Sequence, residues 1–133
     1  MLKGTLTIFL PLLLSCNLGA SEISNSETTK RIDAEFDSCL AAKPKANLSL
    51  LECSDEITES WDKELNSRYR KLIKTLNPSE EAALRHSQRL WIKFRDAEFA
   101  YLEEVYNDSS AISHMLRFST ARSYVVKQRA LGF

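Results

Sequence analysis

The sequence has very little glycine outside its first 20 residues. Of three glycines, Gly132 alone lies beyond that point. A phosphate-cradling loop needs several glycines, so the sequence excludes a nucleotide site of that kind. No stretch alternates between apolar and polar residues as a half-buried strand does. The predicted fold class is therefore all-α.

Groups that carry enzyme chemistry are also scarce. The two histidines, His86 and His114, each lack a second histidine or cysteine at metal-ligand spacing along a helix. Each is predicted to be a surface residue. No nucleophile is paired with a base either. We therefore expect no catalytic residue, no metal and no cofactor, and interpret the protein as a non-enzyme.

Neither sign of charge is in excess, because 18 basic side chains meet 18 acidic ones. Nucleic-acid-binding domains normally show a basic surplus, so nucleic acid is not an expected partner. The sequence leaves the oligomeric state open.

Long apolar runs are missing as well. The one candidate, Leu6–Leu14, is about half the ~20 residues that a membrane-spanning helix needs. It follows Lys3 and precedes small residues, which is typical of a signal peptide over residues 1–20. Export to the periplasm or the extracellular space is the expected result.

Cys16 has two open interpretations. It is either an inert part of the cleaved leader or the lipidated first residue of a lipoprotein, since Leu13-Leu14-Ser15-Cys16 is similar to a lipobox. The second would tether the protein to a membrane. Residues 21–30 are polar and are predicted to form a disordered spacer, so the helical domain should span 31–133.

Helical periodicity fills that domain. We expect helices over about 32–42, 48–76, 79–106 and 111–130, with Asn77, Pro78 and Glu80 capping the third. The connection there is short, which favours an antiparallel hairpin. The predicted architecture is a small antiparallel bundle of about four helices around this long hairpin. In the third helix the residues expected to face inward are Leu84, Trp91, Phe94, Tyr101, Leu102 and Val105.

Cys39 and Cys53 are the pair expected to form one disulfide. They lie 14 residues apart across a turn at Lys43–Pro44, and a bond between them would join the first two helices.

Two polar and aromatic signatures repeat at helical steps. The first contains Asp62, Leu65, Asn66 and Tyr69, and the second contains Gln88, Trp91, Arg95 and Asp96. A hairpin centred near residue 77 would place Asn66 opposite Gln88 and Asp62 one turn from Arg95. We interpret them as a structural network in which Asp62, Asn66, Gln88 and Arg95 form its buried polar part. Asp62→Leu should then cost over ~1 kcal/mol. The alternative is that these side chains meet only water.

Together with Cys39 and Cys53, these signatures resemble the LprI-type lysozyme-inhibitor-like family of small secreted helical domains, from about Cys39 to Arg129. The family usually has a second cysteine pair, but Phe99 and Ala121 occupy those places here. The resemblance implies a protein-binding module that blocks a lysozyme-type muramidase. The alternative is a structural or interaction protein of the cell envelope without inhibitory activity.

Lysozymes are typically basic, so an acidic surface with aromatic side chains is the expected binding face. The third helix and the loop after it carry the candidates: Glu98, Tyr101, Glu103, Glu104 and Asp108.

Overall fold

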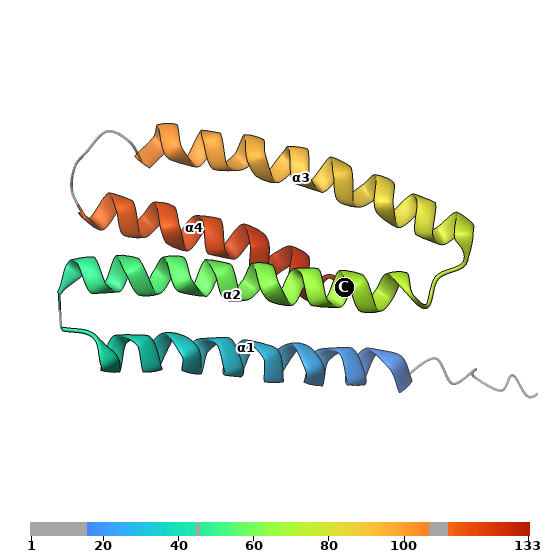
Figure 1. The fold of residues 1–133 in the computed structure, drawn as a ribbon, viewed down its shortest axis with the longest axis horizontal. Coiled ribbons are helices and arrows are strands. Elements are labelled where there is room, and N and C mark those ends of the chain that lie inside the picture. Colours follow the sequence, from blue (N-terminus) through green and yellow to red (C-terminus); the bar gives the residue numbers. More distant parts are fainter. Residues whose placement is uncertain (1–15, 45, 107–111) are drawn as a thin grey trace, which may run out of the picture.

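A computed structural model describes residues 16–44, 46–106 and 112–133 of the chain. These residues form four helices and no strand: α1 (Cys16–Ala42), α2 (Asn47–Ile73), α3 (Pro78–Tyr106) and α4 (Ile112–Leu131). Figure 1 shows them as long rods that run side by side. The predicted all-α bundle is confirmed, and the predicted starts of the last three helices are correct to within one residue.

The connection between α2 and α3 folds as the sequence predicts. Asn77 caps α3, because its side-chain oxygen accepts hydrogen bonds from the backbone N–H groups of Ser79 and Glu80, both at 3.0 Å. The Glu80 carboxylate in turn accepts the N–H of Asn77 at 2.9 Å. This reciprocal capping satisfies N–H groups that lack a partner within the helix.

The predicted disulfide between Cys39 and Cys53 is confirmed. It joins the last turn of α1 to the first half of α2, with a Cα–Cα distance of 5.8 Å. Cys53 is fully buried. The cross-link therefore fixes the C-terminal end of α1 against α2.

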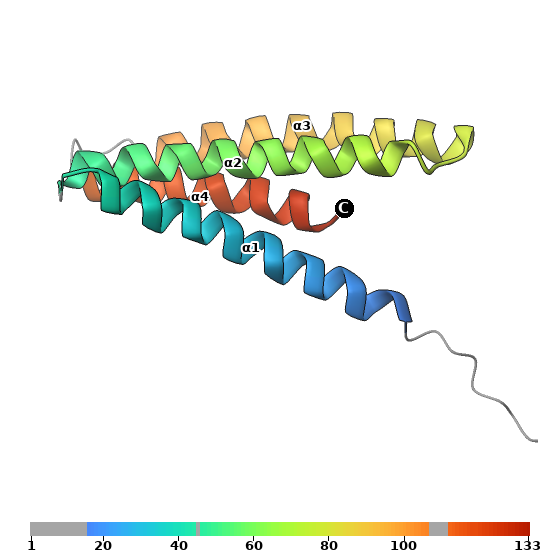
Figure 2. The same cartoon turned by 60° about the horizontal axis from the view of Figure 1, so that its bottom comes forward.

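Helix α4 takes a position that the sequence did not predict. It packs closely against both α2 and α3, whereas α2 and α3 are not among the closely packed pairs of helices. Figure 1 shows α4 between the two arms of the hairpin, and Figure 2 shows the same helices turned by 60°. The arms are antiparallel as expected, but the side chains that face each other across the predicted hairpin are separated by α4.

The buried core lies where α1, α2 and α4 meet. Trp61 and Leu65 of α2 contact Val126 and Ala130 of α4, and Ile32 of α1 closes the cluster. Each of these side chains is at most 3% exposed. The partly buried residues packed around them are Ile57, Trp91, Phe99, Leu131 and Phe133.

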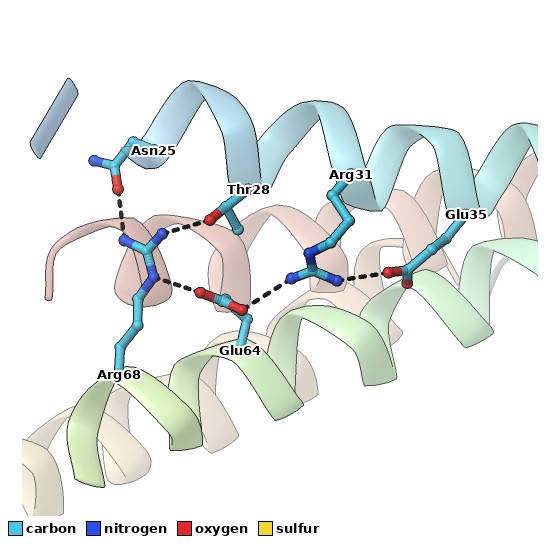
Figure 3. A network of polar contacts seen from close by, with 6 residues as sticks. All are labelled: Asn25, Thr28, Arg31, Glu35, Glu64 and Arg68. Atoms are coloured by element: carbon cyan, nitrogen blue, oxygen red, sulfur yellow. Dashed lines mark hydrogen bonds and ion pairs between the residues drawn. The ribbon is translucent and has the colours of Figure 1, made fainter. Parts of the chain in front are cut away.

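The first helix differs from the sequence prediction. Residues 21–30, expected to be a disordered spacer, belong to α1. Their polar composition offers little apolar surface to bury, and Ile23 is 63% exposed. Polar contacts hold this segment instead: Arg68 of α2 donates to Asn25 and to Thr28 (Figure 3). Asn25 in turn donates to the Leu131 carbonyl of α4.

None of the described helices is long and apolar enough to cross a membrane. Residues 1–15, which contain most of the predicted leader, lie outside the described part. Cys16 is the first residue of α1.

Candidate functional site

One exposed side of α3 carries a row of apolar side chains. Leu90, Phe94, Tyr101 and Val105 follow one another at steps of four, seven and four residues, which places them on one side of the helix. Their exposed fractions lie between 46% and 60%. We call these four residues the α3 stripe. Large apolar side chains gathered on one exposed face are a feature of binding surfaces.

Acidic residues accompany the α3 stripe. Glu98 is half-buried beside it, whereas Glu103 and Glu104 are exposed near its C-terminal end. Tyr101, at 60% exposure, lies among them. Asp108 lies outside the described residues. The described candidates from the sequence therefore share the second half of one helix with an apolar surface that had not been predicted.

The prediction of which α3 residues face inward was partly wrong. Phe94, Tyr101 and Val105 were expected to face inward, but they are exposed, whereas Leu102 is buried and Leu84 is half-buried. The helix has two neighbouring apolar stripes, one buried and one exposed. The sequence prediction treated both as a single inward-facing stripe. Steps of four, seven and four from Leu90 are the sequence signal that separates the second stripe.

The apolar members of the two signatures are packing residues. Leu65 is buried in the core, and Trp91 packs against that cluster. Tyr69 is half-buried, and its ring centroid lies 5.9 Å from that of Phe133. These residues join α2 and α3 to the C-terminal end of the chain.

The polar members do not form the predicted network. Asn66 donates to the Asp62 carboxylate on the same helix at 2.9 Å. Gln88 accepts a hydrogen bond from Arg129 of α4 at 3.1 Å. Arg95 pairs with its neighbour Asp96 at 2.6 Å. The interposed α4 keeps the α2 and α3 members apart. The predicted hydrogen bonds between the two signatures are therefore replaced by bonds within each helix or to α4.

This arrangement changes the expected cost of Asp62→Leu. The hydrogen bond that Asp62 accepts is exposed and local to α2, and such pairs contribute a few tenths of a kcal/mol. We expect the free energy of unfolding, measured by urea denaturation, to fall by less than about 0.5 kcal/mol. A loss above about 1 kcal/mol would restore the buried-network interpretation.

Cations stacked on aromatic rings hold α3 against α4. The Arg129 guanidinium lies 5.8 Å from the Trp91 ring and 4.5 Å from the Phe133 ring. The Arg122 guanidinium of α4 lies 5.1 Å from the Phe99 ring of α3. Arg95 stacks on Trp91 and Phe99 within α3 itself, at 5.6 and 5.9 Å. Each such contact is worth roughly 0.5–2 kcal/mol. The contacts between α4 cations and α3 rings supply cohesion at an interface to which α3 contributes one buried residue, Leu102.

Arg129 is the residue in this interface that sequence reasoning missed. It also donates to Ser87 at 3.2 Å, and burial lowers the pKa of its guanidinium from the usual range. An arginine nevertheless stays charged at neutral pH. The sequence signal was the absence of acidic residues near the C-terminus, which left these cations free to pair with aromatic rings.

The two histidines have different surroundings. His86 is exposed, as predicted. His114 was also expected at the surface but is half-buried, with its ring edge-on to Tyr106 at 6.5 Å. The residues that the structure describes contain no group of three metal-ligating side chains.

A comparison with known protein families identifies the family of this chain. Residues 39–130 match the family described as lysozyme inhibitor LprI, which covers most of the chain. No curated protein and no solved structure matched the sequence of this chain.

Proposed function

Because the chain belongs to the lysozyme inhibitor LprI family, we propose that it is an exported protein-binding module that inhibits a lysozyme-type muramidase. We assign the binding surface to the outer face of α3. The exposed α3 stripe is the observation that supports this choice.

Aromatic side chains give the stripe its binding potential. Tyr101 and Phe94 are 60% and 54% exposed, so each can bury a large area against a partner. Aromatic residues are enriched among the few residues that dominate binding energy, because they bury much surface and lose little side-chain entropy. The partner should therefore present an apolar patch that covers the middle of α3.

Charge complements this apolar contact. Glu98, Glu103 and Glu104 place three carboxylates along the same half of α3. A basic partner such as a lysozyme would be attracted to this end of the helix, which speeds association and orients the encounter. Inhibition should accordingly weaken as the salt concentration rises.

Titration of a muramidase with the purified, oxidised protein tests this function. We expect saturating inhibition near one-to-one, with a complex that elutes as a single species in size-exclusion chromatography. A complex without loss of muramidase activity would favour the envelope interaction protein. The absence of both inhibition and complex would refute the proposed function.

Tyr101→Ala tests the surface. We expect it to weaken inhibition by about tenfold or more, because loss of a central aromatic contact commonly costs over 1 kcal/mol. Tyr124→Ala is the matched control, since Tyr124 of α4 is 61% exposed and lies outside the stripe. Isothermal titration calorimetry measures the Kd of each variant for the muramidase. Parent-like binding by Tyr101→Ala, or equal weakening by Tyr124→Ala, would rule out the α3 face.

A further inference from the structure

A groove runs between α2 and α3, with α4 as its floor. Its volume is about 640 Å³, and Val126 of α4 lies at its base. Pockets of this size hold small organic ligands. The groove exists because α4 separates the two arms of the hairpin, and it is distinct from the outer face of α3.

The α2 wall of the groove carries more acidic than basic side chains. Asp55, Glu59, Asp62 and Lys63 line it, and steps of four and three residues place the three carboxylates on one helix face. Asp55 accepts a hydrogen bond from Ser119 at 2.7 Å. Glu59 lies 3.8 Å from Lys63 in a pair that is mostly exposed. These partners leave carboxylate oxygens free to accept further hydrogen bonds.

The other side of the groove is basic. Arg95 of α3 and Arg122 of α4 line it, and Phe99 lies between them. The two guanidinium carbons are 5.9 and 5.1 Å from the centre of this one ring. Stacking on a ring leaves the N–H groups of a guanidinium available to carboxylates. Arg95 already donates from its Nε and one terminal nitrogen to Asp96, which leaves its other terminal nitrogen for a ligand.

The two walls are not joined to each other. In the described residues, Arg95 pairs with Asp96, which does not line the groove, and Arg122 forms no ion pair. Neither arginine bonds to Asp55, Glu59 or Asp62. Opposite charges thus line one cavity without neutralising each other across it.

We infer that this groove binds a small zwitterionic ligand, namely a short peptide or amino acid with a free amine and a free carboxylate. Its carboxylate lies between Arg95 and Arg122, and its amine lies against Glu59 and Asp62. The acidic wall repels a simple anion and the arginines repel a simple cation, so only a ligand with both charges matches both walls.

Tri-alanine with free termini is the probe. The full, oxidised protein is titrated while backbone amide shifts of groove residues are followed by NMR. N-acetylated and C-amidated tri-alanine are the matched ligands, because each removes one charge. We expect the unmodified peptide to bind at least about tenfold more tightly than either blocked form, since each lost charge removes charge-assisted hydrogen bonds.

Two variants assign the ends of the peptide. Arg122→Gln should reduce the preference for the free carboxylate severalfold, because Arg95 alone remains to bind it, while the preference for the free amine stays unchanged. Asp62→Asn should do the reverse. Arg117→Gln is the control, because Arg117 is exposed on α4 outside the groove. Far-UV circular dichroism verifies that all three remain helical.

Three results would overturn the inference. One is equal binding of free and blocked peptides. Another is the absence of groove shifts at roughly 10 mM peptide, where a millimolar Kd would already give near-saturation. The third is coupling between Arg122→Gln and Glu59→Gln in the stability of the unliganded protein, which would mean that the walls pair with each other. None of these results bears on muramidase inhibition through α3.

Discussion

Removal of the Cys39–Cys53 disulfide is expected to lower the free energy of unfolding by about 3 kcal/mol. The bond closes a short loop, with a sequence separation of 14 residues. Its main effect is to restrict the unfolded chain, since it keeps the ends of that loop together when the helices come apart. The loss should therefore occur even where the native helices stay in place.

Urea denaturation of the oxidised protein and of the Cys39→Ala/Cys53→Ala double variant measures this loss. Adding a reductant to the double variant is the control, because it should change nothing further. The variant should keep its helical circular dichroism below the transition. A difference under about 1 kcal/mol would show that the unfolded chain is compact around this turn even without the bond.

The sequence predicted the last three helices well because their signals are local. Capping at Asn77 and Glu80 depends on residues within one turn, and the break at Pro44 depends on one residue. Trp61 and Leu65 of α2, which are spaced at a helical step of four residues, are both buried. Local patterns of this kind do not change with the partner that a helix packs against.

The arrangement of the helices was harder to predict because it depends on competition between faces. A short turn predicts that α2 and α3 are antiparallel, but it does not decide which surface fills the space between them. Val126 and Ala130 of α4 occupy that space. The polar signatures were then paired within helices or with α4, as Asn66 with Asp62 and Gln88 with Arg129 show.

The exposure of the candidate binding residues was predicted in part. Glu103 and Glu104 are exposed, but Tyr101 and the apolar side chains next to it, which are also exposed, were assigned to the inner face of α3. α3 attaches to α4 through cations of α4 stacked on rings of α3, as Arg129 on Trp91 and Arg122 on Phe99 show. A helix held in this way needs fewer buried apolar residues. The apolar residues of the α3 stripe are therefore not required for packing and stay exposed.

The polar segment at the start of α1 depends on Arg68. Its side chain is 13% exposed and contacts three acceptors: Glu64 at 2.7 Å, Thr28 at 2.8 Å, and the amide oxygen of Asn25 (Figure 3). Arg31 contacts the same Glu64 at 2.9 Å but is 52% exposed. The two arginines thus share one carboxylate and differ in burial.

Arg68→Ala should therefore destabilise the protein by about 2 kcal/mol, because it leaves partly buried acceptors without their charged donor. Arg31→Ala is the matched control and should cost less than about 0.5 kcal/mol, since exposed ion pairs contribute little. Arg68→Lys should recover only part of the loss, because an ammonium group cannot reach three acceptors as a planar guanidinium does.

Hydrogen exchange locates the effect of Arg68→Ala. Residues 22–30 of α1 bury little apolar surface, and the contacts from Arg68 tie them to α2. Without those contacts the amides of this segment should exchange faster, whereas Trp61 and Leu65 in the core should keep their protection relative to global unfolding. Equal acceleration in both regions would mean that Arg68 supports the whole bundle. Unchanged exchange in residues 22–30 would mean that the helix persists there without help from α2.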